Sequence, residues 1–421
     1  MLPGARVRTV VAMSTDHTSL AELLRASGGR RYAVVLAVDA VGGGLLRPFL
    51  LLYGITMLHL RPDEAGLAVT AGLLAGLAVL PLVGRWIDGG ARSGVVSATL
   101  FIRAVGTVVL LVSDHPVTFF AATVLQGMGS QAFGTAHGAV IATLTTGRSR
   151  DAALAATRSL RNAGLGVGAL AATLAVAHGD GALRWLAAID SVALLVAGAL
   201  VLPMRLAAPP RTATTVAARG ALRQLTPLLL ANLPYALCFA VLEVVLPALI
   251  VTHLHQSPAW SAAMFVGNTA LVVLAQVVVV RHLSRWPRST VLAASGVVLS
   301  LSYLGFWAAG TLGGVAAAGA LATICVLYTI GEIMYAGSST GLVIASAPPE
   351  LLGQALARFQ LCYGLGVAVA PALLTALLTV GTAVLWLTLT GLTMLAVATV
   401  VARSSSWDRT RRTNRLKSPS V

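Results

Sequence analysis

Long apolar segments separated by short arginine-bearing segments dominate this 421-residue chain. A helix needs about 20 mostly apolar residues to cross the hydrocarbon core of a bilayer. Only 10% of the residues are charged, whereas a soluble domain usually carries about a quarter. The composition therefore excludes a soluble enzyme, a disordered chain and a fibrous protein. We expect twelve membrane spans, at 32–58, 64–83, 94–112, 117–144, 153–178, 182–203, 225–252, 259–281, 289–309, 315–346, 354–380 and 383–403.

The residue types in these spans predict an all-α membrane protein. Membrane-crossing strands alternate apolar and polar residues, and the sequence lacks that alternation, which argues against a β-barrel. Small residues let helices approach closely in lipid, and the 42 glycines suit such contacts. Cys238, Cys325 and Cys362 lie in apolar segments and fit neither a disulfide framework nor a metal cluster.

The basic residues predict the orientation in the membrane. Cytoplasmic loops of membrane proteins collect Lys and Arg. With the N-terminus inside, 25 of the 29 basic residues fall in cytoplasmic segments, including Arg158 and Arg161 at the start of the fifth span. Only Arg61 and Arg184 fall outside. We therefore expect both termini in the cytoplasm and a location in the plasma membrane. Basic residues spread over alternating loops also argue against a nucleic-acid partner.

The sequence divides into two halves that look related. Gly164-Leu-Gly-Val167 recurs as Gly364-Leu-Gly-Val367, and Arg158 recurs as Arg358 at the same offset of 200 residues. This repetition predicts two pseudo-symmetric six-helix bundles. A polar segment with a proline pair between them is typical of a linker. The expected units are an N-tail at 1–31, a bundle at 32–203, a linker at 204–224, a bundle at 225–403 and a basic C-tail at 404–421.

The N-tail is expected to be a polar cytoplasmic segment. Its arginines flank no apolar core long enough for a signal peptide. Either Met1 or Met13 fits as the start of the protein.

Four carboxylates fall inside predicted spans: Asp39, Asp190, Glu243 and Glu332. A charge at bilayer depth costs about 2.5–3.5 kcal/mol on insertion scales, so such residues persist where they face protein or water. Burial favours the protonated form of a carboxyl group, which lets it exchange a proton near neutral pH. We expect Asp39, Glu243 and Glu332 to serve proton coupling or substrate contact. The alternative is a packing role against Arg47 or backbone donors, and we expect Asp190 to be structural.

Helical spacing places further polar residues beside these acids. Asn232, Tyr235 and Glu243 are expected on one face of the seventh span, and Tyr328, Glu332 and Tyr335 on one face of the tenth. In two pseudo-symmetric halves, spans 1, 4, 7 and 10 would surround a central cavity. Carboxylates and aromatic faces attract cations, so this lining predicts an amphipathic, cationic substrate. The expected cavity residues are Asp39, Arg47, Gln126, Asn232, Tyr235, Glu243, Tyr328, Glu332 and Tyr335.

The loop between spans 2 and 3 reads Gly84-Arg-Trp-Ile-Asp88-Gly-Gly-Ala-Arg92-Ser93. It resembles the Gly-x-x-x-Asp-Arg-x-Gly-Arg-Arg signature of the major facilitator superfamily, in which Gly84, Asp88 and Arg92 match. The resemblance implies a twelve-helix fold of two bundles that opens alternately to each side. It also implies a conformational latch, formed where Asp88 meets the positive N-terminus of the eleventh span. Arg358 would be an added partner.

A latch is one of two roles that Asp88 could have. It could instead cap the start of the third span. The equivalent loop of the second half, 281–289, contains no acid, so we expect no second latch there.

A second resemblance concerns the fourth span. Leu125-Gln-Gly-Met-Gly129 resembles a signature of proton-driven antiporters, which carries an arginine three residues before the glutamine. Thr123 occupies that position here, and Arg47 is a candidate substitute. The fifth span lacks the Gly-Pro pair of drug antiporters.

These observations predict a secondary transporter that exports a small organic molecule in exchange for protons. Uptake of a polar nutrient by a symporter or facilitator is the alternative, and a membrane-embedded enzyme or receptor is a remote one. The sequence contains no Walker loop, His-Glu-x-x-His motif or Cys/His metal spacing, so we expect neither enzymatic activity nor a cofactor. The expected partners are the substrate, protons and the bilayer, with the protein as a monomer.

Overall fold

The structure is a computed structural model in which every described element is helical. Only the backbone is described for residues 404–417. The described residues are 29–46, 50–112, 115–176, 181–204, 206, 216–312 and 314–417. The expected N-tail, most of the linker and Arg47 therefore lie outside the described residues.

Within the described residues, the first bundle contains seven helices. They are α2 (Gly29–Leu46), α3 (Leu50–Met57), α4 (Pro62–Asp88), α5 (Arg92–Leu111), α6 (Pro116–Leu144), α7 (Gly147–Val176) and α8 (Ala182–Val201). A 3₁₀ turn, Leu202–Met204, follows α8.

The second bundle contains short helical pieces followed by long helices. The pieces are α9 (Val216–Gln224), α10 (Thr226–Ala236), α11 (Cys238–Ala240), the π-helix η3 (Val241–Val245), α12 (Leu246–Ala248) and the π-helix η4 (Leu249–His253). The long helices are α13 (Ala259–Leu283), α14 (Arg288–Gly310), α15 (Gly314–Ser346), α16 (Leu352–Val380) and α17 (Thr382–Lys417). The 3₁₀ turn η5 (Pro349–Leu351) precedes α16.

These helices reproduce the twelve predicted spans to within a few residues at most ends. Among the described residues, ten helical stretches are long and apolar enough to cross a membrane, and α2 with α3 makes an eleventh. The 29-residue α6 has the length but falls below that apolarity, because glycines, two glutamines and a histidine interrupt it. The prediction of an all-α membrane protein is confirmed.

The structure differs from the expected spans at three places. Part of the predicted linker is the helix α9, and α17 continues to Lys417, where no proline or glycine interrupts the polar sequence. The fifth predicted span began at 153, whereas α7 begins at Gly147. Arg158 and Arg161, which were expected at the start of the fifth span, therefore lie near the middle of α7.

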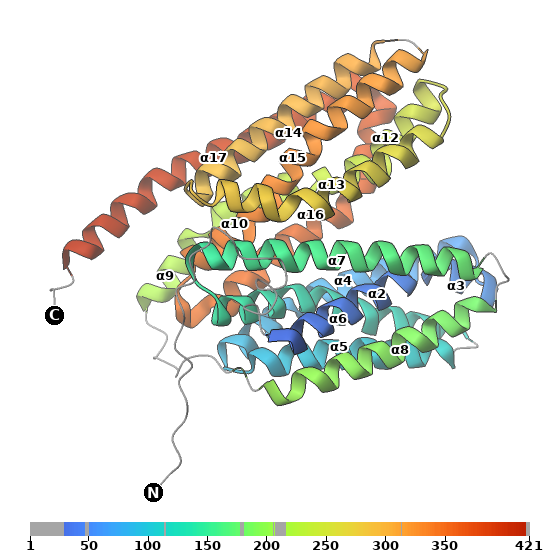
Figure 1. Cartoon of the computed structure of the whole chain (residues 1–421), viewed down its shortest axis with the longest axis horizontal. Helices are drawn as coiled ribbons and strands as arrows, with labels where there is room; N and C mark the ends of the chain where they lie inside the picture. Colours follow the sequence, from blue (N-terminus) through green and yellow to red (C-terminus); the bar gives the residue numbers. More distant parts are fainter. Residues whose placement is uncertain are drawn as a thin grey trace, which may run out of the picture.

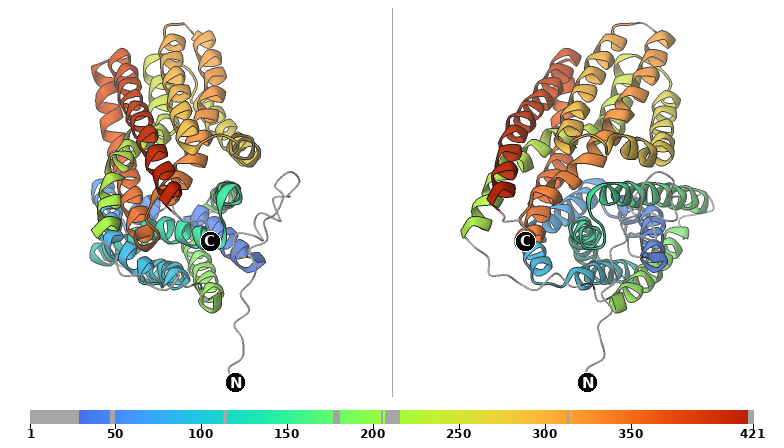
Figure 2. Two further views of the ribbon diagram at one scale, coloured as in Figure 1. Left: turned by 90° about the vertical axis from the view of Figure 1, so that its left-hand side faces the viewer. Right: turned by 60° about the vertical axis from the view of Figure 1, so that its left-hand side comes forward.

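The two bundles lie beside one another and diverge along their length. Figure 1 shows them close together at the end where α17 terminates and spread apart toward α3 and α12. In both views of Figure 2 most of the yellow-to-red helices lie above the blue-to-green ones, while the orange α16 reaches down to α4 of the first bundle. The contacts between bundles run from α4 and α6 to α16, and from α7 to α13 and α15.

Glycines allow close helix contacts both within and between the bundles. A Cβ added to Gly168 of α7 would overlap the Val41 carbonyl oxygen of α2, and a Cβ at Gly366 of α16 would lie 2.9 Å from the carbonyl oxygen of Leu233 in α10. Gly364, the counterpart of Gly164 in the repeat, instead meets Leu77 of α4 in the first bundle. The fifth and eleventh membrane helices therefore each pack on the first helix of their own half, but through glycines that are not equivalent in the repeat.

Two residues with a left-handed backbone conformation lie at equivalent positions in the two halves of the chain. His59 follows the first membrane helix with φ of 51°, and His255 follows the seventh with φ of 50°. Such a backbone conformation is uncommon outside glycine, so its occurrence at equivalent turns supports an internal duplication.

Candidate functional site

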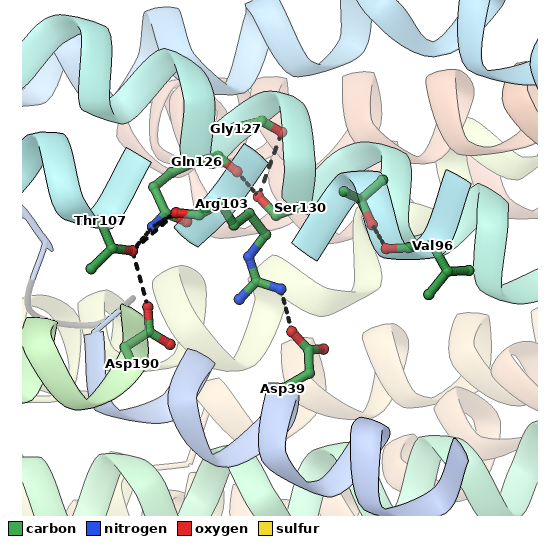
Figure 3. Close-up of polar contacts among 9 residues, drawn as sticks. Asp39, Val96, Arg103, Thr107, Gln126, Gly127, Ser130 and Asp190 are labelled. Carbon is green, nitrogen blue, oxygen red and sulfur yellow. Dashed lines mark hydrogen bonds and ion pairs between the residues drawn. The ribbon is translucent and has the colours of Figure 1, made fainter. Parts of the chain in front are cut away.

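A buried ion pair lies inside the first bundle. Asp39 of α2 accepts a hydrogen bond from Nη1 of Arg103 on α5, and the two side chains are 2% and 1% exposed. Figure 3 shows the two side chains pointing toward one another across the bundle. Asp39 was expected to serve proton coupling or substrate contact, or to pack against Arg47 or backbone donors, and the structure places it against Arg103 of α5.

A polar network extends from this pair. Thr107 of α5 donates to Asp190 Oδ2 of α8 over 3.2 Å, and Gln126 of α6 donates from Nε2 to Thr107 and to the Arg103 carbonyl oxygen (Figure 3). The charge of Asp190 also acts on Arg103. Four membrane helices therefore converge on one arginine and two carboxylates, with Gln126 inside the first bundle.

Arg103 is the functional candidate that sequence reasoning missed. It lies within the span expected at 94–112 but is absent from the expected cavity residues. Because charges buried in a membrane pair with one another, the two in-span acids of this half already called for such a partner. Thr123, in the position of the antiporter arginine, donates to the Ala68 carbonyl oxygen over 2.8 Å and joins α6 to α4.

The polar side chains predicted on the seventh and tenth spans split into two groups. Tyr328 donates to the Cys238 carbonyl oxygen, and Tyr335 donates to Asn232 Oδ1. Tyr235 stacks on Tyr335 with ring centroids 5.0 Å apart. Each of these side chains is buried.

Tyr235 also donates to the Leu292 carbonyl oxygen of α14, over 2.8 Å. This group therefore holds the second bundle together from within.

Glu243 lies apart from that group. It is exposed, whereas Asn232 and Tyr235 are buried. Glu243 lies in the π-helix η3, and a π-helical turn contains more residues than an α-helical turn, which shifts the register of everything that follows. The expected common face of these three residues is therefore absent.

Glu332 faces the other bundle. Its Oε2 accepts from Asn268 Nδ2 of α13 over 2.9 Å, and its Oε1 lies 3.8 Å from Arg158 Nη2 of α7. The Glu332 side chain is 9% exposed, while that of Arg158 is 33% exposed. This ion pair joins the two bundles at mid-helix.

Aromatic rings surround Arg158 and its neighbour Arg161. The Arg158 guanidinium carbon lies 5.2 Å from the ring centroid of Phe239, and that of Arg161 lies 5.8 Å from Phe133. Phe239 also meets Tyr363 of α16 edge to face, at 5.7 Å between centroids. These distances are within the range of cation–π attraction.

Asp88 lies at the N-terminus of α16. Its Oδ1 accepts from the Gly353 backbone N–H over 2.6 Å, and its Oδ2 accepts from the backbone N–H and side-chain Nε2 of Gln354, over 3.2 and 3.1 Å. A Cβ on Gly353 would collide with the Gly84 carbonyl oxygen. The glycines of α4 and α16 thus bring Asp88 within reach of the free amides that begin a helix.

The two arginines associated with the latch differ in their relation to Asp88. Arg92 donates to Thr143 at the end of α6, and its charge also acts on Asp88. Arg358 is exposed on α16, and within the described part of the chain its side chain has neither an ion pair nor a hydrogen bond. The structure therefore does not bring Arg358 to Asp88.

A second polar contact joins the bundles near the same end. Arg288 at the start of α14 donates from Nε to both carboxylate oxygens of Asp151 in α7, over 2.9 and 3.0 Å. Its Nη2 also donates to the Gly147 carbonyl oxygen over 2.9 Å. The expectation that loop 281–289 forms no such contact rested on its lack of an acid; the acid comes from the first bundle.

Comparisons with known proteins agree with this architecture. A sequence profile of the Major Facilitator Superfamily matches residues 32–371. The chain is 24% identical over 342 residues to YhjO of Bacillus subtilis (strain 168), described as an uncharacterized MFS-type transporter, with 78% of this chain and 80% of YhjO covered.

Solved structures share the fold at low sequence identity. The human organic anion transporter MFSD10 matches with a TM-score of 0.68 and 16% identity, over 90% of this chain and 99% of that one. A bacterial homologue of the iron transporter ferroportin, in an outward-facing state, matches with a TM-score of 0.72 and 16% identity, over 91% and 100%. FucP in the outward conformation matches with a TM-score of 0.69 and 13% identity, over 89% and 97%. With its two bundles of membrane helices and a profile match over most of its length, the chain belongs to the Major Facilitator Superfamily and is a multi-pass membrane transporter.

Proposed function

We propose that this transporter couples the movement of a small organic molecule to the movement of protons, and that Asp39, Arg103 and Asp190 form the coupling site. The observation that carries the proposal is that acidic and basic side chains meet where water is excluded. Asp39 and Arg103 form an ion pair with side chains 2% and 1% exposed, and Asp190 is joined to them through Thr107 of α5. A buried carboxylate is stabilised by a cationic partner, and binding a proton weakens its attraction to that partner. Protonation of one of these carboxyl groups would therefore loosen the contact between α2 and α5.

The contacts between bundles support alternating access. Asp88 and Arg288 each hold α4 or α14 to a helix of the other bundle at the end where the bundles are close. We assign this end to the cytoplasm because the basic segments lie there and because two structures of the same fold are in outward conformations. Both termini and the linker are then cytoplasmic, and the bundles 32–203 and 225–403 move against one another.

We propose export by proton antiport across the plasma membrane, by a monomer. The antiporter-like segment 125–129 supports this direction, and its Gln126 belongs to the coupling cluster. Uptake is the second candidate, because FucP, which is described as a fucose:proton symporter, shares the fold.

The test uses protein reconstituted in vesicles that contain a pH-sensitive dye, under an imposed pH gradient. Lipophilic cations, neutral antibiotics and aromatic carboxylates are added in turn, and the change in internal pH is followed. A transported compound should move protons with the wild type and not with Asp39→Asn. Asp63→Asn is the matched control, because Asp63 is exposed and paired with Arg61 at the surface. If Asp39→Asn exchanges protons normally, or if transport ignores the pH gradient, the coupling site is wrong. Proton flow in the same direction as the compound selects uptake.

A further inference from the structure

We propose that Arg158 and Arg161 bind the anionic group of the transported molecule, which makes that molecule a small organic anion with a flat apolar body. The inference rests on the proposed transport function and adds the class of substrate. It differs from the cationic substrate that carboxylates and tyrosines predict, because Arg158 and Arg161 were not among the expected cavity residues.

Arg158 and Arg161 are three residues apart on α7, so they lie on neighbouring turns of one helix face. Both lie near the middle of α7, which runs from Gly147 to Val176. Arg158 reaches Glu332 of the other bundle, and Arg161 lies against Phe133 of its own bundle. A molecule bound to both would touch the place where the bundles meet.

The charge balance at this place favours an anion. Glu332 is the carboxylate that contacts the pair, at 3.8 Å from Arg158 and with its other oxygen held by Asn268. Within the residues that the structure describes, Arg161 forms no ion pair. The charge of Asp39 acts on Arg161, but Asp39 is itself paired with Arg103. Two guanidiniums therefore share one contacting carboxylate, and a bound anion would supply the second.

The arginines are also accessible. A third of the Arg158 side-chain surface is open, at 33%, and Arg161 is partly exposed. The long distance from Arg158 to Glu332 leaves guanidinium N–H groups for another acceptor. Arginine is suited to this purpose because its planar group binds carboxylate, sulfonate or phosphate oxygens in pairs.

Aromatic rings define the rest of the ligand. Phe239 and Tyr363 lie edge to face beside Arg158, and Phe133 lies beside Arg161. Flat apolar groups stack favourably on such rings. Phe133 belongs to the first bundle and the other two rings to the second, so the ligand would contact both.

This arrangement gives the ligand a way to act on the bundles. An anion that binds Arg158 competes with Glu332 for the same guanidinium. Ligand binding would then weaken an ion pair that joins α7 to α15 and favour separation of the bundles there, in line with the rule that a ligand shifts a conformational equilibrium through its differential contacts.

The experiment measures binding of two dyes with one ring system and opposite charge, the anion fluorescein and the cation rhodamine 123. Fluorescence anisotropy is recorded with the purified full chain in lipid nanodiscs, without a proton gradient. We expect fluorescein to bind about tenfold or more tightly than rhodamine 123, as one charge-assisted hydrogen bond allows. Arg161→Gln should weaken fluorescein binding about tenfold or more on the same grounds. Arg184→Gln should leave it unchanged, because Arg184 is exposed at the start of α8.

Glu332→Gln tests whether the ligand and Glu332 compete for Arg158, because competition predicts a gain in affinity when the carboxylate is removed. Removing the carboxylate frees Arg158, so fluorescein should bind more tightly. Arg161→Lys keeps the charge and should retain part of the affinity; together with Glu332→Gln it tests the site if Arg161→Gln fails to fold, as judged by thermal unfolding.

The proposal is overturned if rhodamine 123 binds more tightly than fluorescein, if neither dye binds, or if Arg161→Gln behaves as Arg184→Gln does. Its failure is distinct from failure of proton coupling. Intact fluorescein binding in a protein that moves no protons would refute the coupling site alone, and proton-coupled transport of lipophilic cations would refute the anion site alone.

Discussion

Asp151 of α7 and Arg288 of α14 form a bidentate ion pair that joins the two bundles near the end where Asp88 meets α16. In both contacts the acid belongs to the first bundle and the donor to the second. A strict repeat would place the second acid in loop 281–289, so the helices repeat while the charges at this end do not.

The first prediction concerns this ion pair. Asp151→Arg places two arginines together and should shift the protein toward the state in which this end is separated. The exchanged variant Asp151→Arg/Arg288→Asp should restore the wild-type distribution, because the pair is re-formed with reversed sign. Spin labels at Arg61→Cys, just before α4, and at Ser257→Cys, just before α13, report the distance between the bundles at their spread end. Both positions are exposed. Equal distance distributions for single and double variants would show that the pair does not control the conformation.

The second prediction concerns Asp88. An amide in its place loses the negative charge that the α16 N-terminus attracts, and its NH₂ group cannot accept from a backbone N–H. Asp88→Asn should therefore slow transport about tenfold, as expected for the loss of about 1.4 kcal/mol from a charge-assisted contact. The rate of substrate uptake into vesicles checks this, with Asp63→Asn alongside. A wild-type rate in Asp88→Asn would show that the contact with α16 does not control transport and would favour the alternative, in which Asp88 only caps the start of the third span.

The third prediction concerns the approach of α4 to α16. A Cβ at position 353 would overlap the Gly84 carbonyl oxygen and lie 2.9 Å from Asp88 Oδ1. Gly353→Ala should therefore push the helices apart and shift the spin-label distances in the same direction as Asp151→Arg. Gly94→Ala is the control, because its Cβ would have Ala91 Cβ as nearest neighbour at 3.9 Å. If both alanines behave alike, the close approach does not hold the end together.

The fourth prediction concerns the Asp39–Arg103 pair. Removing one partner of a buried ion pair costs about 3–5 kcal/mol, because the other charge is left without compensation. Asp39→Asn and Arg103→Gln should each lower the thermal stability of the purified protein, whereas the double variant should recover most of the loss. Unfolding followed by tryptophan fluorescence measures this. Additive losses in the double variant would mean that the two side chains do not compensate one another.

The sequence predicts the membrane helices well because their length and apolarity are local properties. The spans near 259–281 and 289–309 agree with α13 and α14 within two residues. The repeated glycines at 164 and 364 both lie at helix contacts, but at different ones: Gly164 meets α2 of its own bundle, whereas Gly364 meets Leu77 of the other bundle. Small residues at a helix contact are required by the contact itself, and they remain visible in the sequence.

The site was harder to predict because it depends on relations between helices. The end of a polar loop and the start of a span are ambiguous in hydropathy. The expected start of the fifth span falls six residues after the start of α7, so Arg158 and Arg161 were counted with the cytoplasmic segments and given no ligand-binding role. Helical spacing assumed one register from Asn232 to Glu243, and the π-helix η3 changes it. The pairing of Asp39 with Arg103 depends on where α2 and α5 lie relative to one another, which the sequence of neither helix predicts by itself.

The contact between Asp88 and α16 is made mainly with peptide groups. Gly353 and Gln354 each donate a backbone N–H to it, and only the third hydrogen bond comes from a side chain. Every residue except proline carries that backbone donor. Mutations that alter side chains at the start of α16 therefore leave two of the three hydrogen bonds available, provided that the residue at 353 stays small. The two sides of this contact consequently tolerate mutation unequally: α4 must keep its acid, whereas position 354 of α16 can vary in almost any way that avoids proline.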